Sequence, residues 1–230
     1  MTHTYPPEAT IEVPVNLGRT TTISVRDEDA LVAARRLHEC GLRPVVLNFA
    51  SARNPGGGWN VKGVRGQEEE LCRRTDLAAH LGAPSAERFY ADHAKVDAMN
   101  SSWVLYSDGV VVKDAEPWTC AFVSCAAPNA KELFRSGRPA EELRELEAEI
   151  AAVFETRAER ILAVAASQGH PSVVLGAWGC GNFGNDPRVV AGAFTRALRG
   201  PFLDVFSEVA FAVPGRSLRV AFESAVRGEA

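Results

Sequence analysis

The chain has 230 residues, of which 46% are hydrophobic, so it is long enough to bury one large core, and we expect a single domain over residues 1–230. Its net charge of −4 argues against the broad basic surface of a protein that binds a nucleic-acid backbone, so we expect no direct nucleic-acid partner. The five cysteines include no Cys-x-x-Cys pair, the N-terminus has no signal-peptide pattern and no apolar run is long enough for a bilayer, so we expect a cytoplasmic protein without a membrane partner.

The first predicted elements are two short strands, over residues 11–15 and 20–25. Both runs are rich in β-branched residues, and residues 16–19 between them contain an asparagine and a glycine, which is typical of a hairpin turn or of a break between edge strands. This end of the chain is therefore expected at an edge of a sheet.

A helix and a buried strand follow. Asp27 is predicted to cap the helix, in which Leu31 and Leu37 share one face, and Gly41 stands where a helix C-terminus prefers glycine. Residues 45–49 form a continuous apolar run, which is typical of a strand covered on both faces in a parallel sheet. Because ligands of open α/β sheets bind at the carboxyl ends of such strands, we expect a binding site directly after this one.

The connection after this strand contains three consecutive glycines, Gly56, Gly57 and Gly58. Without a Cβ atom their backbone can adopt positive φ and bring N–H groups close to a phosphate, although a flexible surface turn has the same composition. A helix is predicted over residues 66–81, and it opens with Gln67 and three glutamates. The helix dipole alone favours carboxylates in a first turn, so these acids have a structural as well as a catalytic explanation.

The middle of the chain is predicted as a polar, partly helical connection, a β-hairpin and a buried strand. The hairpin has strands over residues 103–106 and 110–113, joined by a turn at Asp108 and Gly109. The buried strand covers residues 121–125.

The second half of the chain alternates helices and strands. The expected segments are a long helix over residues 139–169, a strand over 173–176, a helix over 186–198, a strand over 209–213 and a helix from residue 217. The charged run in the long helix is interpreted as a solvated face. This order predicts one three-layer α/β/α domain with a mixed central sheet, whose edge strands lie near the N-terminus and at residues 103–113.

A second glycine-rich segment, at residues 175–187, follows a predicted strand and precedes a predicted helix. Backbone N–H groups in such a turn can bind a diphosphate, although a loop that needs positive φ also explains the glycines. Two aromatic residues, Trp178 and Phe183, are interleaved with them. A nucleophilic thiol at Cys180 served by His170 is a rival hypothesis, but no charge that would stabilise a thiolate stands nearby in sequence.

The glycines Gly56–Gly58 followed by Gln67–Glu69 resemble the signature of the poly(ADP-ribose) glycohydrolase family. The longer strings NFASARNPGGG and QEEELCRRTDL are similar to its compact bacterial and fungal type, and GCGNFG near residue 180 extends the resemblance over nearly the whole chain. The resemblance implies a macrodomain-like fold and hydrolysis of the ribose–ribose O-glycosidic bonds of poly(ADP-ribose), mainly from the chain end, with release of ADP-ribose. It also implies no metal or other cofactor, ADP-ribosylated proteins as substrates, and a role in reversing ADP-ribosylation, as in the DNA damage response.

By this resemblance Glu69 is the catalytic acid and base, Glu68 holds ribose hydroxyls, and Glu70 is a variable position that points away. Cleavage passes through an oxocarbenium-like state, in which an acid protonates the departing oxygen and then activates water. Crowded carboxylates are expected to raise each other's pKa, which suits such an acid. Phe183 matches the aromatic that packs on the ribose next to the scissile bond. The residues implied in substrate binding are Ser51, Asn54, Gly56, Gly57, Gly58, Gln67, Gly179, Cys180, Gly181, Asn182, Phe183 and Gly184.

Ser51 departs from the family pattern, because many relatives have an asparagine there that contacts the distal ribose. A serine can donate one hydrogen bond to a ribose hydroxyl, and Asn48 and Asn54 are nearby candidates to share the contact. Two other function classes stay open: a hydrolase of mono-ADP-ribosylated protein or nucleic acid, and a non-catalytic ADP-ribose-binding module. The paired acids after Gln67 disfavour the binding module, because binding alone does not require them.

Overall fold

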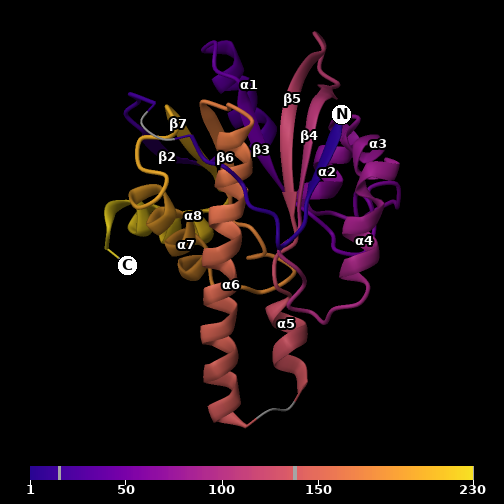
Figure 1. Cartoon of the computed structure of the whole chain (residues 1–230), viewed down its shortest axis with the longest axis vertical. Helices are drawn as coiled ribbons and strands as arrows, with labels where there is room; N and C mark the ends of the chain where they lie inside the picture. The colour runs from indigo at the N-terminus through magenta and orange to yellow at the C-terminus, as the bar shows by residue number, and fades with distance from the viewer. Residues whose placement is uncertain (15–16, 137–138, 230) are drawn as a thin grey trace.

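A seven-stranded mixed sheet lies at the centre of the computed structural model, which describes residues 1–14, 17–136 and 139–229 (Figure 1). The strands, in the sheet order β1-β4-β5-β3-β6-β7-β2, are β1 (Thr2–Tyr5), β4 (Val104–Val112), β5 (Trp118–Cys125), β3 (Pro44–Phe49), β6 (Ser172–Gly176), β7 (Glu208–Ala212) and β2 (Thr22–Arg26). The run from β5 to β2 is parallel, whereas β4 is antiparallel to both of its neighbours. The carboxyl ends of the parallel strands therefore meet along one edge.

Helices cover both faces of the sheet. One layer holds α1 (Ala30–Glu39), α2 (Gln67–Arg74), α3 (Leu77–Leu81) and α4 (Glu87–His93), and the other holds α6 (Ala140–Ser167), α7 (Pro187–Arg199) and α8 (Arg216–Arg227). The short segments are η1 (Pro84–Ala86), α5 (Ala130–Leu133) and η2 (Phe134–Ser136). In β3, Val45 and Leu47 pack into one hydrophobic cluster and Val46 into the other, so the strand is buried on both faces. The predicted three-layer arrangement with a mixed sheet is confirmed.

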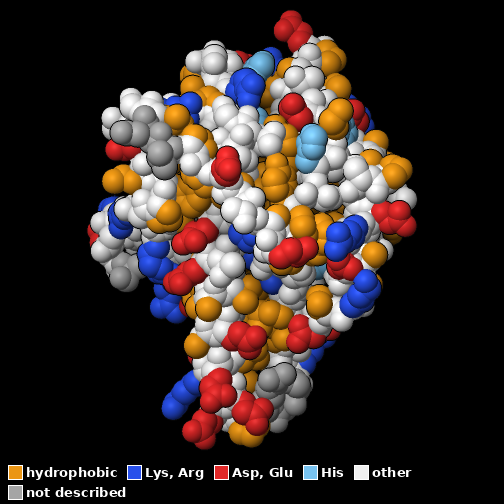
Figure 2. All heavy atoms as spheres, viewed as in Figure 1, with side chains coloured by type: hydrophobic (Ala, Val, Ile, Leu, Met, Phe, Trp, Pro, Cys, Tyr) orange, Lys and Arg blue, Asp and Glu red, His pale blue; other side chains and the backbone are white. Residues whose placement is uncertain are grey.

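Helix α6 has 28 residues, and its N-terminal half projects beyond the sheet (Figure 1). Its apolar stripe, which includes Leu146, Ile150 and Phe154, is buried, while acidic side chains gather on the projecting end (Figure 2). Within the described ranges no helix, α6 included, is both long and apolar enough to cross a membrane. The other segments predicted for the second half of the chain correspond to β6, α7, β7 and α8.

The prediction for the N-terminal strands is wrong in two respects. Residues 11–14 form no strand, Val15 and Asn16 lie outside the described residues, and the first strand is instead β1, which pairs with β4. The strand predicted over residues 20–25 corresponds to β2, which runs parallel to β7. Because β1 and β2 lie at opposite edges of the sheet, they form no hairpin.

Asp29, and not Asp27, caps α1. Its Oδ1 atom accepts hydrogen bonds from the backbone N–H groups of Leu31 and Val32, both at 2.9 Å. Asp27 is engaged elsewhere, because it forms an ion pair with Arg219 of α8. The choice between the two aspartates thus depends on a partner that is distant in sequence.

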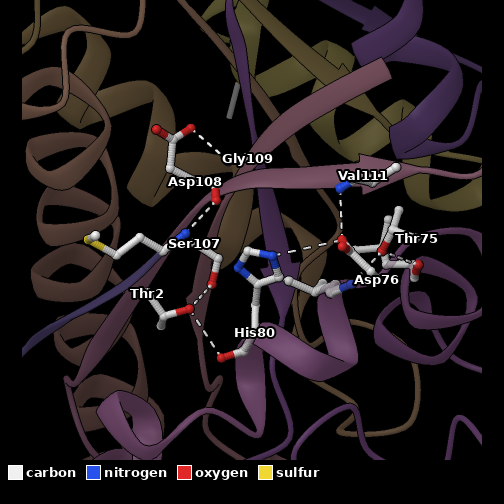
Figure 3. Close-up of polar contacts among 11 residues, drawn as sticks. Thr2, Thr75, Asp76, His80, Ser107, Asp108, Gly109 and Val111 are labelled. Atoms are coloured by element: carbon white, nitrogen blue, oxygen red, sulfur yellow. Dashed lines mark hydrogen bonds and ion pairs between the residues drawn. The ribbon is translucent and has the colours of Figure 1, made fainter. Parts of the chain in front are cut away.

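The hairpin predicted over residues 103–113 is also wrong, because β4 is one strand with a bulge after Ser107. Gly109 adopts a φ of 68°, and its N–H donates to Asp108 Oδ1 at 2.8 Å, so the Asp-Gly pair forms a bulge instead of a turn (Figure 3). Both halves of β4 pair with β5, and β1 covers the opposite side, where the hydroxyl oxygens of Thr2 and Ser107 lie 3.2 Å apart. Strand β4 is therefore not the edge strand that the sequence predicts.

The helix predicted over residues 66–81 is divided at Thr75 into α2 and α3. The Thr75 hydroxyl donates to the Leu71 carbonyl at 2.7 Å, and Asp76 accepts a hydrogen bond from the N–H of Val111 at 2.7 Å (Figure 3). These contacts tie the break to β4, which explains why the helix stops there. The connection that follows is partly helical, as expected, because it contains η1 and α4.

Candidate active site

A cavity of about 770 Å³ opens at the carboxyl ends of β3, β6 and β7. The predicted site residues that line it are Ser51, Asn54, Gly57, Gly58, Gln67, Glu68, Glu69, Gly179, Gly181, Asn182 and Phe183. They come from the connection after β3, the first turn of α2 and the loop after β6. The parallel strands thus bring both glycine-rich loops to one cavity, as the argument from strand ends predicts.

Glu68 lies in the wall of this cavity with 3% of its surface exposed. Its Oε1 atom accepts a hydrogen bond from Asn48 Nδ2 at 3.1 Å, and its Oε2 atom accepts one from the backbone N–H of Ser51 at 2.8 Å. Burial raises the pKa of Glu68 from 4.5 to about 8, and the charge of Glu69 adds to this rise. Hydrogen bonds from the N–H of Ser51, from Asn48 and from the N–H of Gly56 oppose it. The fold therefore keeps Glu68 protonated near neutral pH, and burial contributes more to this than the crowding of carboxylates that the sequence predicts.

Glu69 is half-buried, and its carboxylate is held between two glycines. The Oε1 atom accepts a hydrogen bond from the N–H of Gly58 at 3.1 Å. A Cβ atom at Gly57 would overlap Oε1, and one at Gly66 would overlap Oε2. The glycine run is therefore needed to seat this carboxylate, a role that the sequence argument from phosphate binding did not include.

The two residues that flank the acid pair have different surroundings. Gln67 joins α2 to β3, because its Oε1 accepts from the N–H of Phe49 at 2.9 Å and its Nε2 donates to the Leu47 carbonyl at 2.7 Å. Glu70 is exposed at the rim of the cavity and pairs with Arg73 at 2.9 Å. Among the residues that the structure describes, no group of three or more His, Cys, Asp or Glu side chains is arranged to hold a metal ion.

Ser51 organises the start of the first loop. Its Oγ atom accepts hydrogen bonds from the N–H groups of Arg53 and Asn54, at 3.2 and 3.1 Å, which leaves its hydroxyl proton available to a ligand. Asn48 is fully buried and donates to Ser124 Oγ at 3.0 Å as well as to Glu68, so it orients Glu68 and does not line the cavity. Of the two asparagines considered for the ribose contact, only Asn54 reaches the cavity.

The two aromatic residues of the second loop have different environments. Phe183 is half-buried and lines the cavity. The Trp178 ring is fully buried, packs edge-to-face on Phe154 with ring centroids 5.1 Å apart, and donates through Nε1 to the Cys125 carbonyl at 3.0 Å. Trp178 thus belongs to the core beneath the loop, although it also lies at the cavity wall, and Phe183 is the more exposed of the two rings.

Asn185 was not identified from the sequence, although it holds the second loop in place. Its Nδ2 atom donates to the Pro128 carbonyl at 2.8 Å and to the Gly179 carbonyl at 2.9 Å. Gly179 has a φ of 74°, and a Cβ atom there would press on Asn185 Nδ2 and on Ala127. A buried asparagine that follows a glycine-rich loop was the available signal, because its amide must find partners.

Three of the residues implied in substrate binding, Gly56, Cys180 and Gly184, are not among those that line the cavity. Gly56 faces inward, where a Cβ atom would meet the Trp59 ring. Burial raises the pKa of the Cys180 thiol to about 12, and His170 precedes β6 whereas Cys180 follows it. The rival hypothesis of a thiol nucleophile is therefore wrong.

Arg157 of α6 supports the wall between the two loops and was also missed. It is 2% exposed, and its guanidinium donates to the carbonyls of Ala126, Met99 and Asn100, each at 2.9 Å. Burial lowers the pKa of Arg157. The connection that it holds contains Ala127, which lines the cavity. The sequence feature that indicates a buried arginine is its place three residues after Phe154, on the apolar stripe of the helix.

One end of the cavity is built from elements that the sequence did not connect with the site. Its lining residues there are Asp29, Ala30, Ala212, Pro214 and Leu218. Two arginines, Arg65 and Arg74, also line the cavity, and Arg74 pairs with Asp29 at 3.0 Å. The position of β7 next to β6 explains this end, because its carboxyl terminus opens onto the same edge.

Comparisons with known proteins agree with this geometry. The family model described as the catalytic domain of microbial-type PARG, or poly(ADP-ribose) glycohydrolase, matches residues 1–114. The poly(ADP-ribose) glycohydrolase of Deinococcus radiodurans, crystallised with ADP-ribose, is 32% identical with a TM-score of 0.86, and the match covers 100% of this chain and 95% of that one. That of Thermomonospora curvata, bound to the inhibitor ADP-HPD, is 39% identical with a TM-score of 0.80 over 96% of this chain and 84% of that one. No match was found among curated protein sequences.

Proposed function

Because the chain belongs to the microbial-type poly(ADP-ribose) glycohydrolase family, whose members hydrolyse poly(ADP-ribose), we propose that Glu69 is the acid and base of this cleavage. We also propose that the terminal ADP-ribose unit occupies the cavity, with its diphosphate between the two glycine-rich loops. A volume of about 770 Å³ suits a ligand of that size. Cleavage then proceeds mainly from the chain end and releases ADP-ribose.

The observation that carries this proposal is the seating of Glu69. One of its carboxylate oxygens accepts from the N–H of Gly58, and both oxygens lie against glycine backbone at the cavity wall. The carboxylate is thus fixed without a second charged partner. Glu69 forms no salt bridge with the described residues. In its protonated form it gives its proton to the departing ribose oxygen, and the carboxylate that results then takes a proton from the attacking water.

Glu68 has a different part in the proposal. With a pKa of about 8 it is neutral near pH 7, so it both donates and accepts hydrogen bonds with ribose hydroxyls. Where two neighbouring carboxyl groups lie in unlike environments, one commonly acts as the acid and base and the other positions the substrate. The substrate's own diphosphate, held by loop N–H groups, stabilises the positive charge that develops on the ribose.

The proposal includes a biological setting. ADP-ribosylated proteins are the proposed carriers of the polymer. The cysteines are Cys40, Cys72, Cys120, Cys125 and Cys180, and all are free thiols. Free thiols persist in reducing compartments, which supports the cytoplasm as the site of action.

The test is incubation of the purified chain with labelled poly(ADP-ribose), followed by separation of the products. We expect free ADP-ribose to accumulate, with shortening of chains from one end. Binding of ADP-ribose without any turnover of the polymer would instead identify a binding module. Release of ADP-ribose only from singly modified protein would identify a hydrolase of mono-ADP-ribosylated substrates.

A further inference from the structure

Arg65 is a cation at the cavity with no partner among the residues that the structure describes. It is exposed, lines the cavity, and makes no hydrogen bond or ion pair with any residue in the described ranges. Arg74, the other arginine in the lining, is already paired with Asp29. In a chain with a net charge of −4, an arginine left unpaired beside a binding cavity is available to an anionic ligand.

The backbone around Arg65 is held in place by α2. Arg73 donates through Nε to the Trp59 carbonyl at 3.0 Å and through Nη2 to the Val64 carbonyl, and its Nη1 pairs with Glu70. The two ends of the segment 59–64 are thus fastened to the helix that carries the acid pair. The backbone next to Arg65 is thus fixed before a ligand arrives, which reduces the entropy lost on binding.

The segment 59–65, which carries Arg65, is flanked on both sides by glycines that contact Glu69. It begins after Gly58, whose N–H binds the Glu69 carboxylate, and ends before Gly66, which packs against the other carboxylate oxygen. Arg65 is exposed, lines the cavity and directly precedes Gly66, so it lies close to the proposed acid. The oxygen that Glu69 protonates joins the cleaved unit to the rest of the polymer, so that remainder begins next to Glu69 and extends out of the cavity from there.

We propose that Arg65 binds the diphosphate of the polymer unit on the leaving-group side of the scissile bond, and so favours polymer over substrates that end at a single ADP-ribose. This inference rests on the proposed function. The planar guanidinium forms paired hydrogen bonds with phosphate oxygens, which a lysine cannot reproduce. That diphosphate is one nucleoside away from the reacting oxygen, so the contact adds affinity without touching the reacting atoms.

The test compares the Arg65→Gln variant with two ligands, free ADP-ribose and poly(ADP-ribose) of defined length. Binding is measured in a Glu69→Gln background, so that the polymer survives, and turnover is measured with Glu69 intact. Arg65→Gln should weaken polymer binding about tenfold and raise KM with little change in kcat, while the affinity for ADP-ribose stays within about twofold. Arg65→Lys should recover part of the loss.

Arg144→Gln is the matched control, because Arg144 is exposed on the projecting end of α6 and its loss changes the net charge equally. An equal loss of affinity for ADP-ribose and polymer would overturn the inference, since Arg65 would then contact the unit inside the cavity. Unchanged polymer binding and KM in Arg65→Gln would overturn it as well. Failure of the proposed function gives a different result, namely no hydrolysis by the unaltered chain even when polymer binding depends on Arg65.

Discussion

Gly57 packs so closely on Glu69 that a Cβ atom at position 57 would overlap the Oε1 atom of the glutamate. The first glycine loop therefore fits closely around the Glu69 carboxylate, whether or not a phosphate is bound. Gly57 also adopts a φ of 60°, which other residues rarely accept.

Replacing Gly57 tests this fit. Gly57→Ala should displace the Glu69 carboxylate and reduce kcat by at least roughly tenfold, because small misplacements of a catalytic group are costly. Gly169→Ala is the control, since Gly169 has a φ of 72° but open space around its Cβ position. Both variants should lose about 1 kcal/mol of stability from backbone strain, measured by urea unfolding. Equal loss of activity in the two would show that strain alone, and not the contact with Glu69, is responsible.

Glu69→Gln should reduce polymer hydrolysis by about 10²–10⁴-fold, because general acid and base catalysis is lost. The affinity for ADP-ribose should stay within a few-fold, as measured by calorimetry, since the loops that hold the diphosphate are unchanged. Glu147→Gln, on the exposed face of α6, controls for the removal of one charge. Activity above a tenth of the unaltered chain would remove Glu69 from the catalytic role.

The stability of the chain should depend on pH through Glu68. Folded Glu68 keeps its proton until about pH 8, whereas the unfolded glutamate loses it near pH 4.5. Between these values the folded state binds more protons, so the free energy of unfolding falls as pH rises, by up to about 1.4 kcal/mol per pH unit.

Urea unfolding at several pH values between 5 and about 8 measures this slope. The Glu68→Gln variant should have a flatter dependence than the unaltered chain, and Glu147→Gln should keep the original slope. An identical slope in Glu68→Gln would show that another group is responsible.

Phe183→Ala should lower turnover by roughly tenfold or more while the Tm shifts by only a few degrees, because the ring is half-buried and faces the cavity. Trp178→Ala is the comparison, since its fully buried ring should cost about 3–5 kcal/mol when removed. Thermal melting and initial rates separate the two effects. A large loss of Tm with full specific activity in Phe183→Ala would make this ring a core residue.

Hydrolysis should persist in excess EDTA, and added Mg²⁺ should not increase it. Consecutive residues of a helix point about 100° apart, so Glu68, Glu69 and Glu70 do not converge on one ion, and Glu70 is engaged with Arg73. The diphosphate in the cavity is then neutralised by backbone N–H groups of the two glycine-rich loops. Loss of activity on chelation, restored by magnesium, would contradict this mechanism and the role of Glu69 within it.

The sequence predicts best those features that depend on local pattern. The apolar run of β3, the helix that opens at Gln67 and the two glycine-rich loops all follow from residue order, and strand polarity alone brings the loops to one edge. The Asp-Gly pair in β4 is locally ambiguous between a turn and a bulge, and the length of β5 decides for the bulge. Strand β1 has four residues and exists only because β4 offers it an edge.

Contacts that close the site come from distant parts of the chain, and sequence patterns do not show them. Asp27 pairs with Arg219 and does not cap α1. Asp29 caps α1 instead and forms an ion pair with Arg74 at the cavity. In the sequence Asn185 resembles an ordinary residue before a helix, and the structure shows that its side chain donates to the Pro128 carbonyl. The pKa of Glu68 depends on burial, which the order of residues does not reveal.

The cage around Arg157 has a consequence for motion. Its guanidinium joins carbonyls from two connections, one after α4 and one after β5, to the buried C-terminal half of α6. If either connection opened, the buried Arg157 guanidinium would lose hydrogen-bond partners, so the two connections should fluctuate as one cooperative unit. The free energy of this opening should be closer to that of the core than to that of a surface loop. The amide hydrogens that these connections protect should exchange with solvent slowly and together. One wall of the cavity thus behaves as part of the scaffold, and it should keep its position while substrate enters and product leaves.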